Sequence, residues 1–145
     1  MKNLLIGVIV MSILVGCLSW GAAFAQPSKD YLVATLDILV GEALQAYNSE
    51  DYIKFFEYFS KEMSPVTTKQ YFKALYINGY KRDLGEFHLR ELIENDSSLD
   101  PDFPMMVYKG QFAKCDDARI VVNFAREYDN YRIKRIRIDR ILRYE

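Results

Sequence analysis

The spacing of apolar residues changes near the middle of the chain, and this change constrains the fold more than any other feature. Between residues 30 and 85 the apolar residues recur at three- and four-residue steps, which is the spacing of an amphipathic helix. After residue 105 they alternate with polar residues, as in strands with one buried face. The order predicts an α+β fold, with N-terminal helices packed on one face of a curved antiparallel sheet.

The first predicted helix begins at Asp30, which can cap it, and is broken by Asn48-Ser49. Its single apolar stripe consists of Leu32, Leu36, Leu39, Val40, Ala43 and Tyr47. A second helix is predicted from a Ser49 cap to about Met63, because the residue before Pro65 avoids helical geometry.

A third helix is predicted to open at Thr67, which has capping-box spacing to Gln70, and to end at Gly85. Gly79 inside this helix marks a kink or an earlier end. The following segment, residues 86–95, fits either a strand or a helical face.

The remaining chain predicts three strands, over residues 105–114, 119–127 and 131–142, with residues 115–118 as the first hairpin. In a regular last strand, Ile133 would face one side of the sheet, while Ile136 and Ile138 would face the other. A β-bulge near Lys134-Arg135 would return all three isoleucines to the core face.

An apolar segment precedes this domain. Lys2 is followed by an uncharged run and by Ala23-Phe24-Ala25, which is typical of a secretory signal cleaved after Ala25. We therefore expect a periplasmic or secreted bacterial protein with one domain over residues 26–145. Two alternatives stay open: a lipoprotein acylated at Cys17, and an uncleaved anchor of about 22 residues.

Removal of residues 1–25 leaves 120 residues, with 18 basic against 20 acidic side chains and a formal charge of −2. A nearly balanced exported domain offers no general field for nucleic acid, so we expect no such partner. Contact with the membrane is expected only through an uncleaved or lipidated N-terminus. Cys115 is the single remaining cysteine, so stability must come from core burial and not from an intramolecular disulfide.

Three segments of the second half carry a resemblance to a known superfamily. They are residues 106–112 (MVYKGQF), 120–124 (IVVNF) and 131–136 (YRIKRI). Following the helices in this order, they resemble small secreted members of the nuclear transport factor 2-like superfamily over residues 30–142. The resemblance implies a sheet wrapped around a long helix into a cone, often dimeric and often with a cavity at its mouth. Because that fold hosts enzymes, transport factors and binding modules, it does not decide the function.

Aromatic residues dominate the faces that are predicted to point inward. The pocket candidates among them are Phe56, Phe72, Tyr76, Tyr108, Phe112 and Phe124. Such residues either line a pocket for a small hydrophobic ligand or fill the core of a small domain.

Candidates for other chemistry are few. His88 is the only histidine, and a strand would place it on one face with Glu86 and Arg90, toward solvent. No nucleophile or orienting partner follows from spacing, so we assign no catalytic residue and no cofactor. The acidic loop that holds Asp100 and Asp102 lacks calcium-loop spacing, and we expect no metal site.

The last predicted strand is basic. Arg132, Lys134, Arg135 and Arg137 are candidates for binding a polyanion of the cell envelope, such as lipid head groups. The alternative is a solvated strand face whose charges prevent edge-to-edge aggregation.

These observations favour a non-catalytic exported module that binds a small hydrophobic ligand or an envelope protein. One alternative is a small hydrolase or isomerase that uses His88 or a buried acid. The other is a structural subunit of an envelope assembly, as a homodimer.

The signal segment leads to a direct test. We expect the full-length gene product, expressed in a bacterium and extracted from the envelope, to have the intact mass of a chain that begins at Gln26. A mass corresponding to an acylated chain from Cys17, or to the uncleaved chain, would contradict cleavage after Ala25.

Overall fold

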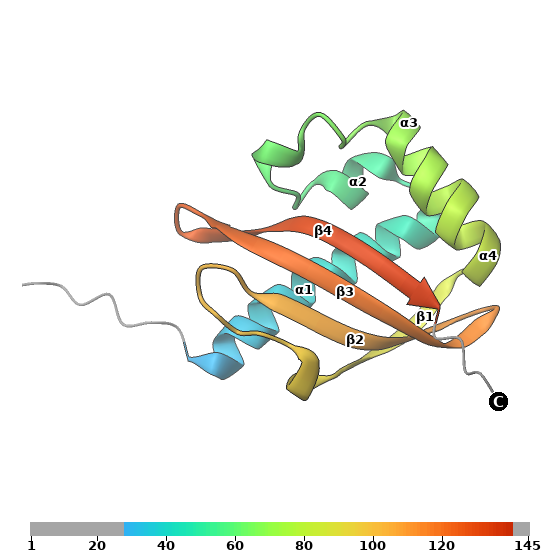
Figure 1. The fold of residues 1–145 in the computed structure, drawn as a ribbon. Coiled ribbons are helices and arrows are strands. Elements are labelled where there is room, and N and C mark those ends of the chain that lie inside the picture. Colours follow the sequence, from blue (N-terminus) through green and yellow to red (C-terminus); the bar gives the residue numbers. More distant parts are fainter. Residues whose placement is uncertain (1–27, 141–145) are drawn as a thin grey trace, which may run out of the picture.

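The computed structural model describes residues 28–140 and shows helices packed on a four-stranded antiparallel sheet (Figure 1). This arrangement confirms the predicted α+β class. The predicted signal segment and Cys17 lie outside the described residues, as does Leu142 at the end of the last predicted strand.

The long helix α1 spans Lys29–Ser49 and carries the predicted apolar stripe. Its N-cap is Ser28, whose hydroxyl accepts a hydrogen bond from the Tyr31 amide, so the predicted Asp30 cap lies instead in the first turn. The helix ends where Glu50 adopts a left-handed backbone conformation (φ 57°) and its amide bonds back to the last turn.

The second helix is shorter than predicted. Helix α2 spans only Tyr52–Phe56, with Asp51 as its N-cap, and a 3₁₀ turn, η1, follows at Lys61–Met63. The chain between them pairs with the last strand. The Ser60 amide donates a hydrogen bond to the Ile133 carbonyl, and the Ile133 amide donates one to the Tyr58 carbonyl, each at 2.8 Å. That pairing requires extended backbone, which a helix running on to Met63 would not supply.

The third helix is continuous but changes its winding. Helix α3 (Lys69–Phe72), with Thr68 and not Thr67 as its N-cap, leads into the π-helical segment η2 (Lys73–Lys81) and then into α4 (Arg82–Leu84). The helical run ends at Gly85 (φ 83°), as predicted. Gly79 lies within η2, so an earlier end at this glycine is wrong.

The sheet has the strand order β1-β2-β3-β4, and its strands are β1 (Phe87–Leu92), β2 (Met105–Phe112), β3 (Cys115–Glu127) and β4 (Asn130–Arg140). The segment that fitted both a strand and a helix is therefore the strand β1. A 3₁₀ turn, η3 (Glu94–Asp96), lies between β1 and β2. Cys115 pairs with Phe112, so the first hairpin turns at residues 113–114 and the segment 115–118 begins β3 instead of forming the turn.

The β-bulge predicted in the last strand is present. Asn123 pairs with Arg135 and the next residue, Phe124, pairs with Ile133, so Lys134 is the extra residue of β4. Ile133, Ile136 and Ile138 are all buried on the inner face. The bulge therefore keeps the isoleucines on one face despite two consecutive polar residues.

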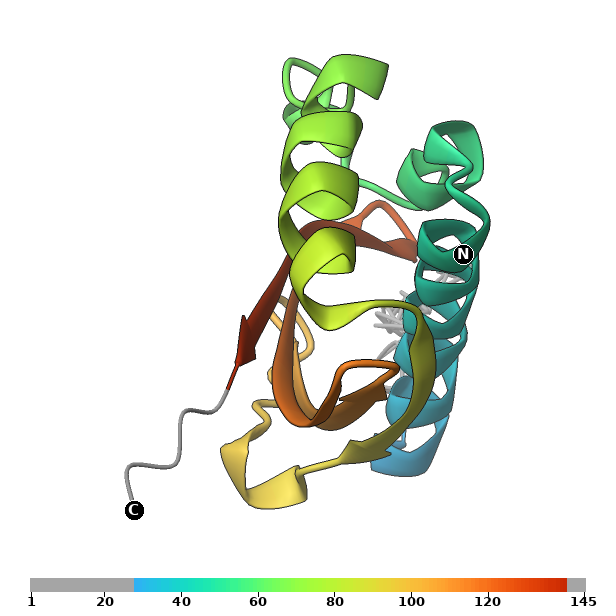
Figure 2. The same cartoon turned by 90° about the vertical axis from the view of Figure 1, so that its right-hand side faces the viewer.

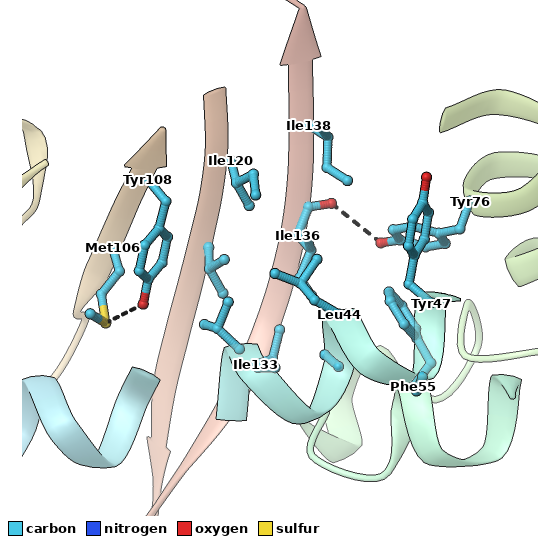
Figure 3. Packing of buried hydrophobic residues seen from close by; sticks show 14 of the residues in the cluster. Leu44, Tyr47, Phe55, Tyr76, Met106, Tyr108, Ile120, Ile133, Ile136 and Ile138 are labelled. Carbon is cyan, nitrogen blue, oxygen red and sulfur yellow. Dashed lines mark hydrogen bonds between the residues drawn. The ribbon is translucent and has the colours of Figure 1, made fainter. Parts of the chain in front are cut away.

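The core lies between α1 and the inner face of the curved sheet (Figure 2). Leu44 and Tyr47 of α1 face Ile133 and Ile136 of β4, while Phe55 and Tyr76 extend the same cluster (Figure 3). The Tyr47 hydroxyl donates a hydrogen bond to the Gly85 carbonyl at 2.9 Å, which ties α1 to the end of the helical run.

The bulge generates a prediction about two deletions in β4. Deleting Lys134 leaves Ile133, Ile136 and Ile138 in strict alternation, so we expect the domain to fold with a free energy of unfolding within about 1 kcal/mol of the wild type. Deleting Arg137 instead turns Ile138 outward, which should cost about 2 kcal/mol for one exposed isoleucine.

Urea denaturation of the two deletion variants makes this comparison. Each deletion removes one basic residue of the same strand, so charge alone cannot separate them. A deletion of Lys134 that destabilises the domain as much as the deletion of Arg137 would contradict the role assigned to the bulge.

Candidate functional site

A hollow with a volume of about 220 Å³ lies between the helical layer and β4. We call it the aromatic pocket. Its lining residues are Phe56, Phe59, Met63, Val66, Tyr71, Leu75, Tyr76, Tyr80, Lys134, Arg135 and Ile136. They come from segments that are distant in sequence and that only the folded chain brings together.

The π-helical segment η2 forms one wall of the aromatic pocket. Leu75, Tyr76 and Tyr80 all lie within it. π-helical winding is rare and occurs often at functional sites, because the wider turn changes the direction of side chains relative to an α-helix. The opposite walls are β4 and the irregular chain after α2, which contributes Met63 and Val66.

The floor of the pocket is a cluster of aromatic rings. Phe55 contacts Tyr76 with ring centroids 4.4 Å apart, and Phe72 stacks on Tyr76 at 5.8 Å. Phe56 and Phe59 meet edge to face at 5.0 Å. Tilted and edge-to-face contacts of this kind hold the rings in defined positions, so the floor is preformed.

The Tyr76 hydroxyl is already engaged at the edge of the sheet. It donates a hydrogen bond to the Ile136 carbonyl at 3.3 Å (Figure 3). Burial raises the pKa of Tyr76, and the neighbouring Tyr71 and Tyr80 raise it further, while Arg135 lowers it. Tyr76 therefore stays neutral and anchors η2 to β4.

Two cations line the β4 side of the pocket. The Lys134 ammonium forms an ion pair with Glu62 at 3.2 Å, and the Glu62 side chain is 73% exposed. Arg135 is exposed and forms no ion pair with any residue in the range 28–140. The aromatic pocket thus combines aromatic and aliphatic lining residues with polar groups, and one of its two cations has no ion pair within residues 28–140.

A second, more open groove, of about 530 Å³, runs between α1 and β1. Its polar residues are Asp37, His88, Arg90 and Tyr108. The Arg90 guanidinium donates to both Asp37 carboxylate oxygens, at 3.1 and 2.8 Å, and lies 5.6 Å from the centre of the Tyr108 ring. Burial and the Asp37 carboxylate raise the pKa of Tyr108, which Arg90 partly opposes.

The position of Arg90 corrects one prediction about β1. The pairing of β1 with β2 shifts register between Phe87 and Leu89, so His88 and Arg90 do not share one solvent-facing side. Arg90 turns toward α1, where Gly41 leaves room for it: a Cβ at this glycine would lie 3.2 Å from the guanidinium. His88 is exposed and makes no hydrogen bond within the described chain.

The structure divides the six aromatic pocket candidates. Phe56 and Tyr76 line the aromatic pocket, and Phe72 supports its floor. Tyr108 lies beneath Arg90 in the second groove, whereas Phe112 and Phe124 are buried in the core.

The four basic candidates are divided as well. Lys134 and Arg135 line the pocket, Arg137 is paired with Asp139 at 2.7 Å, and Arg132 reaches the Glu57 carbonyl at 3.5 Å. They do not form a single row facing one ligand.

Sequence reasoning did not assign Met63, Val66, Tyr71, Leu75 or Tyr80 to a site. The four-residue step from Tyr76 to Tyr80 indicated a shared helical face. Nothing local indicated Val66, which reaches the pocket only because the chain after α2 turns back along β4.

Other kinds of site find no support among the described residues. Within the range 28–140, no group of three or more histidine, cysteine or acidic side chains is arranged to hold a metal ion. None of the helices in that range is long and apolar enough to cross a bilayer. Comparison with protein-family models, curated proteins and solved structures found no match to this chain.

Buried Tyr76 generates a prediction about pH. Its raised pKa means that the folded state binds the hydroxyl proton more tightly than the unfolded state, so this stabilisation is present below pH 10 and is lost as the pH rises further. We expect Tyr76→Phe to cost about 1 kcal/mol at pH 7, where the Ile136 carbonyl loses its donor. That deficit should shrink above pH 10, by up to about 1.4 kcal/mol per pH unit.

Urea denaturation at pH values from about 8 to 11, which bracket the ordinary tyrosine pKa, measures the cost of Tyr76→Phe and its decrease with rising pH. Tyr128→Phe is the matched control, since the Tyr128 side chain is 92% exposed and its hydroxyl makes no hydrogen bond to another residue in the range 28–140. A deficit of Tyr76→Phe that stays constant over this range would contradict the buried, neutral state of Tyr76.

Proposed function

We propose that this protein is a non-catalytic binding module of the bacterial envelope or of the secreted space, and that the aromatic pocket binds a small ligand. The observation that carries the proposal is a preformed aromatic pocket that opens beside an uncommitted cation. Pockets lined by aromatic and aliphatic side chains together with polar groups are typical of small-molecule sites. Export with cleavage after Ala25, and kinship with the nuclear transport factor 2-like superfamily, belong to the same proposal.

The size of the pocket limits the ligand. Its volume is about 220 Å³. This is less than the roughly 300 to 1,000 Å³ that is usual for sites of drug-sized ligands. One aromatic ring or a short acyl chain fits, and a larger molecule would have to extend out of the pocket.

The second groove offers less support for the alternative of a hydrolase or isomerase. A general base must lie within hydrogen-bond reach of the proton that it removes, and a catalytic base is commonly oriented by a further group. Both oxygens of the Asp37 carboxylate accept hydrogen bonds from Arg90, and His88 lacks an orienting partner within the described chain. The contacts of Asp37 and His88 therefore favour binding over proton transfer.

Two matched substitutions test which hollow binds. Val66 lines the aromatic pocket and Val33 lines the groove between α1 and β1, and both side chains are half-buried. We expect Val66→Phe to fill the pocket and to weaken binding of single-ring aromatic and short acyl compounds at least tenfold. Val33→Phe should leave their affinity unchanged.

Ligand-observed NMR with a panel of neutral and charged compounds makes the measurement, and circular dichroism verifies that both variants fold. If no compound of the panel binds, or if Val33→Phe and not Val66→Phe abolishes binding, the aromatic pocket is not the binding site.

A further inference from the structure

We propose that the ligand of the aromatic pocket is a monocarboxylate, with its ring or short acyl chain inside the pocket and its carboxylate on Arg135. This inference rests on the proposed function and adds the chemical class of the ligand. It follows from how charge is distributed around the aromatic and aliphatic side chains that line the pocket.

The charged residues of the pocket wall are both basic. Lys134 and Arg135 line the pocket, and none of its lining residues is acidic. Glu62, the partner of Lys134, lies outside this lining. A cationic ligand would meet two like charges, whereas an anion would be attracted to the wall.

The state of the two cations limits the charge of the ligand to one. Lys134 is paired with Glu62 at 3.2 Å, whereas Arg135 has no ion pair within residues 28–140. A planar guanidinium matches a carboxylate through two parallel hydrogen bonds. A phosphate dianion would leave its second charge without a partner, or would have to displace Glu62.

The neutral polar groups of the pocket fit the same ligand. The Tyr76 hydroxyl is occupied by the Ile136 carbonyl and does not compete for the head group. Tyr71 and Tyr80 also line the pocket, and a tyrosine hydroxyl can donate a hydrogen bond to a carboxylate oxygen. The aromatic floor receives the apolar part of the ligand.

The test compares two probes, 3-phenylpropionate and 3-phenyl-1-propanol. They share a phenyl ring on a three-carbon chain, and they differ in whether the end group is a charged carboxylate or a neutral hydroxyl. Titration calorimetry of the folded wild-type domain should show the carboxylate binding at least tenfold more tightly than the alcohol at low salt. Raising the ionic strength should reduce this preference, because it screens an exposed charge pair.

Arg135→Gln and Arg137→Gln form the matched pair of variants. Both residues are exposed on β4, both variants lose one positive charge, and Arg137 lies outside the pocket in an ion pair with Asp139. We expect Arg135→Gln to weaken 3-phenylpropionate about tenfold and to leave 3-phenyl-1-propanol unchanged. Arg137→Gln should change neither affinity by more than about twofold.

The outcomes separate this inference from the proposed function. Equal affinity for the two probes would overturn the carboxylate assignment while the pocket remains a binding site. An equal loss of affinity for 3-phenylpropionate in Arg135→Gln and Arg137→Gln would do the same. Binding of neither probe, with no binder in the wider panel, would overturn the pocket and the inference together. Binding that survives Val66→Phe would place the carboxylate elsewhere on the surface and would also overturn the inference.

Discussion

Burial of the apolar stripe of α1 against the inner face of the sheet is the interaction on which the rest of the structure depends. Leu36, Val40 and Leu44 are fully buried there and belong to one contiguous cluster with the isoleucines of β4. No disulfide occurs within residues 28–140, where Cys115 is a free thiol. The domain is therefore held by apolar burial and by a few buried hydrogen bonds such as that of Tyr47.

The aromatic pocket arises where this packing is incomplete. Helix α1 covers the inner face of the sheet. The later helical run reaches the β4 edge through Tyr76 of η2, and the chain after α2 reaches the same edge through the pairing of Ser60 with Ile133. These two contacts lie at separate points along the β4 edge, and the aromatic pocket lies between them. Aromatic rings supply the floor of that space, and the bulge at Lys134 brings two consecutive basic residues to its wall.

Much of the fold could be predicted because it depends on local patterns. The stripe of α1, the end of the helical run at Gly85 and the bulge that reunites Ile133 with Ile136 all follow from spacing and from glycine geometry. The early end of α2 could not be predicted, because it results from pairing with β4, some 70 residues later. For the same reason the direction of Arg90 depends on a register shift against β2.

The α+β order, the composition of the core and the presence of aromatic and basic residues follow from the order of residues along the chain, since each depends on period and residue type. Which of these residues form a site depends on the folded arrangement. Phe56, Tyr76, Lys134 and Arg135 meet at one pocket, while Phe112 and Phe124 are buried in the core and Arg137 pairs with Asp139. The physical reason is that a site requires side chains from η2, β4 and the chain after α2 to converge, and convergence is a property of long-range packing.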